Sequence, residues 1–474
     1  TWKGRKALAR ADCVLYDHLA NEALLALAPP GAERLYVGKK KGEHAADQAE
    51  ICRLLLDRAR RGLTVVRLKG GDPFIFGRGG EEAECLAEAG IPFEVIPGVS
   101  TPLGVAAYSG VPLTHRGYTS AVTFVTGHDI GRIEWARVAH AGTLVVFMGL
   151  TNFDQIAAEL LRHGRQPETP AMAVRWATRP DQKTLIGTLA TLPAMIRESR
   201  MKPPAIIIVG EVVTLHGKLD WFERLPLFGK RVVVTRAREQ AGTLSEKLRA
   251  LGAAVTELPT IEIQPAADYA PLDGAISRLE RYDWLIFTSA NGVRFFLERL
   301  DAAGRDLRAL RAKLCAIGPA TRAALEALHL KVDVMGGEYV AESLIAALAG
   351  QDVQGKRVLL PRAAVARDVV PAELRRLGAE IDVVEAYRTV PPESSRALAA
   401  EIFGGDPKPD WITFTSSSTV RNFAALAGVE ALAGVKAASI GPVTSATARE
   451  CGIEIAAEAQ EYTIDGLIAA MLAR

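Results

Sequence analysis

One block of sequence occurs twice in the C-terminal half of the chain, and this repeat restricts the fold more than any other feature. Gly229–Arg236 reads GKRVVVTR, and Gly355–Arg362 reads GKRVLLPR. Repetition on this scale indicates two copies of one structural unit. We therefore expect two similar α/β lobes that face each other across a cleft, an arrangement that often binds ligands. Further pairs follow in the same order: LGAAV at 251–255 with LGAEI at 377–381, DWLIFTS at 283–289 with DWITFTS at 410–416, AIGPAT at 316–321 with SIGPVT at 439–444, and EY at 338–339 with EY at 461–462.

The N-terminal half alternates short apolar segments with stretches of helical character. Alternation of this kind predicts a mostly parallel sheet with helices on its faces. Trp221–Gly229 interrupts the alternation and reads as a linker between the halves. We expect strands at 13–16, 64–68 and 93–96, a crossover at 112–117, and further strands at 121–126, 143–148, 171–174 and 205–209.

Composition excludes several classes of protein. The 57 Lys and Arg nearly balance the 55 Asp and Glu, so nucleic acid is not expected as a partner. No apolar run reaches the length of a membrane span, and we expect no membrane partner. The five cysteines are odd in number and scattered without metal-ligand spacing. We therefore expect reduced thiols, no metal site and a cytoplasmic location.

A glycine-rich segment, Arg67–Glu81, reads RLKGGDPFIFGRGGE and follows an apolar run. Glycine tolerates positive φ and lets the backbone approach a ligand closely. Asp72 stands beside two of these glycines, where its carboxylate can accept hydrogen bonds from a ribose. Many glycine-rich turns bind nothing. The whole segment, however, resembles the S-adenosylmethionine loop of the uroporphyrinogen-III C-methyltransferases, within the tetrapyrrole methylase family.

This resemblance covers residues 1 to about 224. It implies two α/β subdomains, 1–116 and 117–224, that hold S-adenosylmethionine between them, and a homodimer formed through this half. The implied reaction methylates two carbons of uroporphyrinogen III to give precorrin-2, the branch point towards sirohaem and cobalamin. The matching motifs are VLYD at 14–17, YVGK at 36–39, IPGVS at 96–100, PLTHRG at 112–117, VTGH at 125–128, FMGL at 147–150 and VGEV at 209–212.

The resemblance also implies site residues by position. Asp17 corresponds to the family's proposed base and Lys39 to its proposed proton donor. Local pattern leaves alternatives open: Asp17 could cap a helix, Lys39 begins a run of three lysines typical of a solvated surface, and Met148 is of a type common in cores. His115 and His128 lack metal spacing, and we interpret them as structural or substrate-facing. The implied cofactor residues are Gly70, Gly71, Asp72, Ile75, Ser100, Thr101, Met148 and Ala177.

The repeated half, residues 229–474, resembles uroporphyrinogen-III synthase. The resemblance implies an enzyme without a cofactor that expels water from hydroxymethylbilane, inverts ring D and closes the macrocycle to uroporphyrinogen III. We assign one lobe to 225–263 plus 391–474 and the other to 264–390. The predicted fold class is thus α/β, with a two-domain tetrapyrrole methylase-like half followed by a two-lobed α/β synthase half.

Small and hydroxyl-bearing residues after the apolar strands of each lobe form candidate substrate-binding loops. Helix N-termini bind anions, and a linear tetrapyrrole carries many carboxylates. The same Ser and Thr could serve as helix N-caps, and the two roles are compatible. Tyr387 matches the family's catalytic candidate, and a phenol can protonate a departing hydroxyl. The alternative is an aromatic at a strand end that packs on the linker between the lobes. The loop candidates are Thr288, Ser289, Gly318, Thr321, Ser416, Ser417, Gly441 and Thr444.

Two rival functions remain open at this point. The methylase family begins with a strand and a glycine-rich loop before the helix with which this sequence starts, so we expect that segment to be missing and a longer native protein to contain it. An active synthase joined to a methyltransferase-like half without activity is therefore one alternative. A two-lobed binding module without chemistry is the other, although an export signal and disulfides between lobes are not expected.

Overall fold

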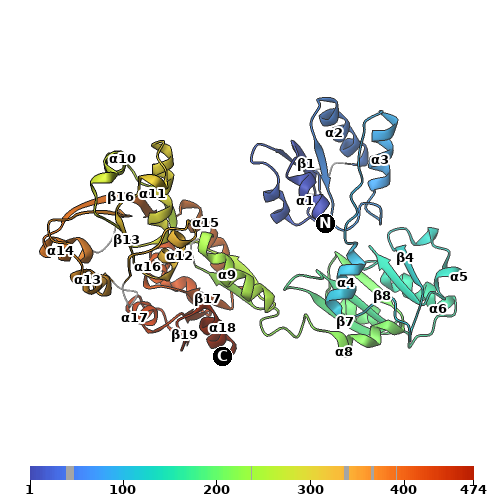
Figure 1. Cartoon of the computed structure of the whole chain (residues 1–474). Helices are drawn as coiled ribbons and strands as arrows, with labels where there is room; N and C mark the ends of the chain where they lie inside the picture. The colour runs from blue at the N-terminus through green and yellow to red at the C-terminus, as the bar shows by residue number, and fades with distance from the viewer. Residues whose placement is uncertain (39–46, 236–237, 336–340, 365–367, 391) are drawn as a thin grey trace. The chain divides into compact units, whose positions relative to one another are not determined.

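The computed structural model describes residues 1–38, 47–235, 238–335, 341–364, 368–390 and 392–474. The chain forms two compact units (Figure 1). Unit 1 comprises Thr1–Gly229 and Leu251–Ala254, and unit 2 comprises Lys230–Ala250 and Val255–Arg474. Both consist of sheets with helices packed on them, which confirms the predicted α/β class. None of the described helices has the length and apolarity needed to cross a membrane.

Unit 1 begins with a three-stranded parallel sheet in the order β2-β1-β3. The middle strand β1 is buried on both faces, because Cys13 and Leu15 pack with residues of α2 whereas Val14 packs with Leu8 of α1. Strands covered on both sides are typical of parallel sheets. The elements are α1 (Trp2–Leu8), β1 (Cys13–Tyr16), η1 (Glu22–Leu27), β2 (Glu33–Tyr36), α2 (Gln48–Arg60), β3 (Val65–Leu68) and α3 (Gly79–Glu88).

The strand predicted at 93–96 is wrong. Residues 91–100 form an irregular segment that pairs with no strand in the described part of the chain, and Phe93 is exposed. Pro92 and Pro97 flank the apolar run and remove two backbone donors that a strand would use. The N–H of Gly98 is instead bound by the carboxylate of Asp72 in the glycine-rich loop.

Helix α4 (Thr101–Ser109) leads into the second sheet of unit 1, ordered β4-β5-β8-β6-β7. In this sheet only β4 and β5 pair in parallel, so the predicted mostly parallel arrangement is wrong here. The loop between β6 and β7 is too short for a crossover, and such neighbours must be antiparallel. The remaining elements are β4 (Val122–Thr126), η2 (Ile130–Arg132), α5 (Trp135–Val138), β5 (Thr143–Phe147), α6 (Phe153–Arg162), β6 (Pro170–Arg175), β7 (Lys183–Thr188), α7 (Leu192–Glu198), β8 (Ala205–Val209), η3 (Glu211–Leu215) and α8 (His216–Leu219).

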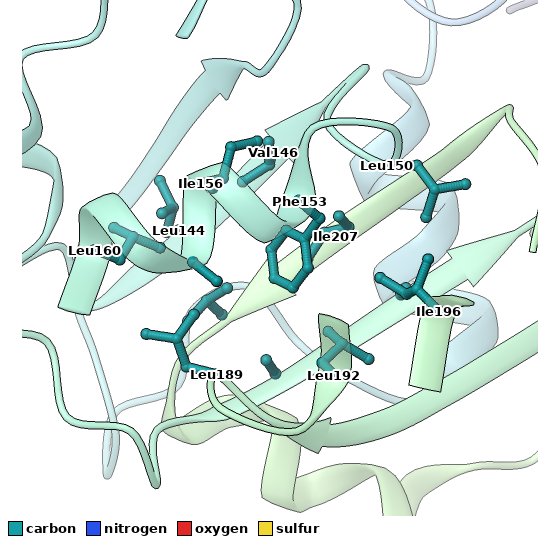
Figure 2. Close-up of a cluster of buried hydrophobic side chains, with 14 of the residues drawn as sticks. Leu144, Val146, Leu150, Phe153, Ile156, Leu160, Leu189, Leu192, Ile196 and Ile207 are labelled. Carbon is teal, nitrogen blue, oxygen red and sulfur yellow. The ribbon is translucent and has the colours of Figure 1, made fainter. Parts of the chain in front are cut away.

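A large hydrophobic core covers one face of this second sheet (Figure 2). Phe153, Ile156 and Leu160 of α6 lie three and four residues apart, which places them on one side of the helix. They pack with Leu144 of β5 and Ile207 of β8, which are fully buried. This core holds the carboxyl ends of β4 and β5 in place, and the candidate site of unit 1 includes residues that follow them.

Unit 2 contains two sheets. The five-stranded sheet runs β10-β9-β17-β18-β19, and the six-stranded sheet runs β11-β16-β15-β12-β13-β14. The strands of the first are β9 (Arg231–Val234), β10 (Ala254–Glu257), β17 (Trp411–Phe414), β18 (Lys436–Ser439) and β19 (Ile455–Glu458). Those of the second are β11 (Glu262–Pro265), β12 (Trp284–Phe287), β13 (Lys313–Ala316), β14 (Val334–Met335), β15 (Arg357–Ala363) and β16 (Glu380–Val390). The α-helices are α9 (Arg238–Ala250), α10 (Ala270–Ser277), α11 (Ala290–Ala302), α12 (Pro319–Glu326), α13 (Ala341–Ala349), α14 (Val369–Arg376), α15 (Glu393–Gly404), α16 (Ser417–Ala427), α17 (Pro442–Glu450) and α18 (Ile464–Leu472), and the 3-10 helices are η4 (Leu279–Arg281), η5 (Leu307–Ala309) and η6 (Val429–Leu432).

The sequence repeat corresponds to equivalent strands with the same register. Trp411 of β17 lies opposite Val232 of β9, and Trp284 of β12 lies opposite Val358 of β15. The aspartate before each tryptophan accepts a hydrogen bond from the backbone of its partner strand, at 2.8 Å from Arg231 and 2.9 Å from Arg357. The two copies of the repeat therefore build the centres of the two sheets in the same way.

Candidate functional site

The glycine-rich loop of unit 1 lies between β3 and α3 and is held by Asp72. One carboxylate oxygen of Asp72 accepts a hydrogen bond from the N–H of Phe74 at 2.9 Å, and the other accepts one from Gly98 at 3.0 Å. Gly71 has a φ of +81°, and a Cβ at Gly98 would overlap its carbonyl oxygen. Glycine at both positions is thus required for the loop to contact segment 96–100.

This contact brings four of the predicted cofactor residues together: Gly71, Asp72, Ser100 and Thr101. Ser100 precedes α4 and is only 6 % exposed, and its hydroxyl has no hydrogen-bond partner among the described residues. A buried hydroxyl without a partner is costly, so this position suits a ligand that supplies one. Gly70 lies instead against the backbone of Leu19, where a Cβ would come within 2.7 Å of the Leu19 carbonyl oxygen.

The other predicted cofactor residues are apolar. Ile75 and Ala177 pack against one buried cluster that includes Val105 and Phe147. Met148 is 54 % exposed and has a φ of +51°, so it is not a core residue. Non-glycine residues with positive φ are uncommon and concentrate at binding sites. The combination of an orphan hydroxyl, a close approach of the backbone at Gly71 and Gly98, and apolar side chains fits an adenosyl ligand with an apolar methyl group.

Asp17 lies at the carboxyl end of β1 and is paired with Arg67. One oxygen of Asp17 is 2.9 Å from a guanidinium nitrogen of Arg67, and the other accepts the N–H of Leu19 at 3.0 Å. The second bond closes a turn, and Asp17 caps no helix in the described structure. Parallel pairing explains the ion pair, because Leu15 of β1 lies opposite Arg67 of β3.

A buried charge cluster extends from this pair and was not predicted from the sequence. Glu82 of α3 is 5 % exposed; its carboxylate lies 2.8 Å from the ammonium of Lys69 and 3.3 Å from Arg67. Burial lowers the pKa of Lys69, and its hydrogen bond to Glu82 opposes that shift. The sequence signal was present, since Arg67 and Lys69 interrupt an apolar strand end, where charges are rarely buried unless they are paired. Lys39, the predicted proton donor, lies outside the described residues.

A hollow of about 540 Å³ lies beside the glycine-rich loop. The loop contributes Phe74, Phe76 and Arg78, and the carboxyl ends of β4 and β5 contribute His128 and Met148. His128 therefore faces this hollow rather than the core. In the described ranges, no group of three or more His, Cys, Asp or Glu is placed to hold a metal ion.

In unit 2, the candidate loops follow parallel strands and begin helices. Thr288 and Ser289 follow β12, and Gly318 follows β13; in the other sheet Ser416 and Ser417 follow β17, and Gly441 follows β18. Neighbouring parallel strands place these loops at one edge of each sheet. Thr321 and Thr444, one helical turn further on, are buried.

The N-cap interpretation is confirmed for the first serine of each copy. Ser289 accepts the N–H of Gly292 at 3.0 Å, and Ser416 accepts that of Thr419 at 3.3 Å. These caps leave the other N–H groups at the start of α11 and α16 free of helical partners. The loops therefore retain donors that an anion can use.

Tyr387 lies near the end of β16 and is 7 % exposed. Its phenol oxygen is 2.8 Å from the hydroxyl of Ser289, and its ring stacks on Phe295 of α11 with 5.7 Å between centroids. Burial raises the pKa of Tyr387, and the hydrogen bond with Ser289 acts in the opposite direction. The structure thus joins Tyr387 to one of the predicted loops, a link that the sequence did not indicate.

Comparison with known proteins assigns both halves. Residues 1–193 match the family model of tetrapyrrole (corrin/porphyrin) methylases, and residues 242–469 match that of uroporphyrinogen-III synthase HemD. The porphyrin biosynthesis protein HemD of Ruminiclostridium josui is 37 % identical over 100 % of this chain and 94 % of its own length. The uroporphyrinogen-III C-methyltransferase of Bacillus subtilis is 37 % identical over 69 % of this chain and 68 % of its own.

Other relatives match only one half. Curated sirohaem synthases of Pseudomonas are about 50 % identical over 47 % of this chain, which spans about half of their length. The crystal structure of uroporphyrin-III C-methyl transferase from Thermus thermophilus, complexed with S-adenyl homocysteine, is 43 % identical and covers 45 % of this chain and 92 % of its own, with a TM-score of 0.39.

The two family models and the full-length relative define an enzyme of tetrapyrrole biosynthesis. The chain belongs to the family of the porphyrin biosynthesis protein HemD, and along it a tetrapyrrole methylase region precedes a uroporphyrinogen-III synthase region. The resemblance predicted from the sequence is confirmed for both halves.

Proposed function

We propose that this chain catalyses two consecutive reactions: closure of hydroxymethylbilane to uroporphyrinogen III, and methylation of uroporphyrinogen III to precorrin-2. The observation that carries the proposal is that both family models match within this one chain, which also aligns end to end with a porphyrin biosynthesis protein. Each unit also contains a site with chemistry suited to its reaction. The product of unit 2 is the substrate of unit 1, which gives the fusion a metabolic reason.

In the synthase reaction, Tyr387 is the proposed acid. The C–O bond of the hydroxymethyl group breaks with both electrons on oxygen, and the phenol proton completes the departing water. The phenolate recovers a proton when the newly joined pyrrole carbon loses its own after ring D has inverted. The loops bearing Thr288, Gly318, Thr321, Ser416, Ser417, Gly441 and Thr444 bind the substrate carboxylates through helix N-termini and hydroxyls.

In the methyltransferase reaction, S-adenosylmethionine supplies an electrophilic methyl group. Gly70, Gly71, Asp72 and Ile75 of the loop, with Ser100, Thr101, Met148 and Ala177, are proposed to hold it, and the Ser100 hydroxyl gains its missing partner. The pyrrole carbon would take the methyl group as its bond to sulfur breaks, S-adenosylhomocysteine would leave, and the macrocycle would then lose a proton. Asp17 is proposed to accept that proton, held in position by Arg67 at 2.9 Å. Lys39 is proposed to donate a proton, as the resemblance implies.

Three further properties belong to this proposal. We propose a homodimer formed through unit 1 and a cytoplasmic location, the latter supported by five free cysteines. We also propose the domain boundaries 1–116, 117–224, 225–263 plus 391–474, and 264–390. Sedimentation of the purified chain tests the dimer, since a monomer at micromolar concentration would contradict it.

Mass spectrometry of the products tests the function directly. The purified chain is incubated with hydroxymethylbilane and S-adenosylmethionine, and the products are separated by isomer. We expect a dimethylated type III product. Unmethylated type III isomer alone would refute the methyltransferase activity and support a methylase-like half without catalysis. The type I isomer alone, which forms spontaneously, would refute the synthase activity and favour a binding module.

A further inference from the structure

The hydroxyls of Ser289 and Tyr387 are 98 residues apart in sequence and 2.8 Å apart in space. The sheet order β16-β15-β12 explains the approach. Tyr387 pairs with Ala363 at the end of β15, and Ser289 follows β12 on the other side of the same strand. The two side chains thus meet over the carboxyl end of β15.

The numbers of protons and lone pairs on the two hydroxyls limit which of them can donate to the other. A serine hydroxyl has one proton and two acceptor positions. The N–H of Gly292 already occupies one acceptor position of Ser289. When Ser289 gives its proton to the phenol oxygen, the phenol O–H of Tyr387 remains available to a ligand. The opposite orientation would use the phenol proton inside the protein.

We propose that Ser289 is a positioning residue for synthase catalysis: its hydroxyl donates to the phenol oxygen of Tyr387 and directs the phenol proton towards the departing hydroxyl of the substrate. The inference rests on the proposed role of Tyr387. Ser289 was predicted from the sequence as a substrate-binding residue, and we now propose positioning of Tyr387 as the main role of its side chain.

The arrangement serves the reaction in two ways. Before proton transfer, the N-cap bond fixes the oxygen of Ser289, and stacking on Phe295 fixes the phenol ring at an interplanar angle of 13°. After proton transfer, the phenolate has a hydroxyl donor in place and needs no reorganisation. The pKa of Tyr387 is consistent with this stabilisation of the phenolate. The hydrogen bond with Ser289 lowers that pKa, which means that it favours the charged form.

The second copy of the repeat provides a natural contrast. Ser416 occupies the position equivalent to Ser289 and caps α16, but its hydroxyl contacts Ser418 at 2.9 Å rather than a tyrosine. Capping is therefore shared by both copies, whereas the serine–tyrosine pair occurs in one copy. A role beyond capping accounts for this difference.

The test compares Ser289→Ala with Thr463→Ala in the full chain. Thr463 caps α18 by accepting the N–H of Gly466 at 3.0 Å, which matches the cap of Ser289, and it lies outside the proposed machinery. Each change removes one N-cap and should lower stability to a similar extent. Ser289→Ala should lower kcat for type III product about tenfold with little change in KM, whereas Thr463→Ala should leave both within about twofold.

Three more variants exclude a merely structural role. Ser289→Thr keeps the hydroxyl and should recover most of kcat. Tyr387→Phe should be slow, and Ser289→Ala should cause no further loss in that background. In the single Ser289→Ala variant, the alkaline limb of the kcat profile should move to higher pH, because a donor that lowers the pKa of Tyr387 has been lost.

The outcomes separate this inference from the proposed function. Equal kcat for Ser289→Ala and Thr463→Ala, with Tyr387→Phe slow, would overturn the role of Ser289 alone. Full activity of Tyr387→Phe would overturn both the acid assignment and this inference, while the synthase activity stands. Absence of type III isomer with the unmodified chain would overturn the proposed synthase function itself.

Discussion

Replacement of Glu82 by Gln should strongly destabilise unit 1. The carboxylate of Glu82 is buried and lies against two cations, Lys69 at 2.8 Å and Arg67 at 3.3 Å. Its side chain is 7 % exposed, and those of Lys69 and Arg67 are 11 % and 12 % exposed. Glutamine keeps the shape but removes the charge, so two cations remain without their shared anion.

The size of the loss follows from burial. Removing one member of a buried ion pair costs about 3–5 kcal/mol, because the remaining charge is left uncompensated. The free energy of unfolding typically falls by about 1–3 kcal/mol per molar urea, so a loss of about 3 kcal/mol lowers the urea midpoint by roughly 1–3 M. The matched control is Glu81→Gln, since Glu81 pairs with Arg78 at the surface. Exposed pairs contribute less than about 1 kcal/mol.

The loss should also depend on pH. Burial lowers the pKa of Lys69 and Glu82 opposes this, so the pKa of Lys69 falls further in the variant. A lysine with a lowered pKa in the folded state binds its proton more readily in the unfolded chain, so stability rises with pH between the two pKa values. The pH range between these two pKa values is wider in the variant, because the folded-state pKa of Lys69 is lower there. The difference between variant and unmodified chain should therefore shrink from about pH 7 to about pH 9.5.

Pulse proteolysis across a urea series measures this in the full chain, because fragments of unit 1 are identified by mass. Far-UV circular dichroism of the folded variants confirms that the native state is retained. Equal midpoints for Glu82→Gln and Glu81→Gln would refute the argument from burial. A loss that stays constant between the two pH values would refute the assignment of the remaining charge to Lys69.

Two other changes test the packing of unit 1. Gly98→Ala should weaken S-adenosylmethionine binding, measured by calorimetry, at least about tenfold, because the added Cβ overlaps Gly71 and separates the loop from segment 96–100. The control Gly217→Ala adds a Cβ with no atom within 4 Å, and equal affinities of the two variants would contradict the steric argument. Phe153→Ala should lower the stability of unit 1 by about 3–5 kcal/mol, because the ring is fully enclosed in the core of Figure 2; a small loss in the urea midpoint would mean that the core collapses around the cavity.

Sequence patterns predicted those features that depend on neighbouring residues. The buried strand at Cys13–Tyr16 and the repeated strands β12 and β17 are apolar runs bounded by turn residues, and each is found. The run at 93–96 has the same local character, but it pairs with no strand among the described residues and is irregular. Local pattern therefore gives candidates for strands, whereas pairing decides among them.

In the candidate site of unit 1, too, the sequence predicted individual residues but not all of the contacts between distant ones. Gly71, Asp72 and Ser100 were predicted from motifs, and the structure brings them together. The contact between Arg67 and Asp17 depends on the register of two strands 50 residues apart. That register cannot be read from either strand alone, although charges at apolar strand ends indicate that partners exist.

Comparison of the two repeat copies explains why one lobe carries the proposed acid. The ungapped match of 251–255 with 377–381 continues to Ile261 and Tyr387. In the first copy, Pro259 stands where the second has Glu385, and β10 ends at Glu257. Leu258 and Thr260, on either side of this proline, still donate their N–H groups to Val234 and Thr235, and the chain then passes into β11 of the other sheet.

In the second copy the strand continues. β16 runs from Glu380 to Val390 and pairs on one side with β15 and on the other, antiparallel, with β11. Tyr387 therefore lies within a strand held from both sides, beside Ser289 and under Phe295. Two nearly equivalent lobes thus acquire different chemistry because β10 ends at Glu257, whereas β16 continues through Tyr387. Glu385→Pro should displace Tyr387 from Ser289 and slow formation of the type III isomer, because proline fixes φ at about −65° within an extended strand, whereas Glu385→Gln should not.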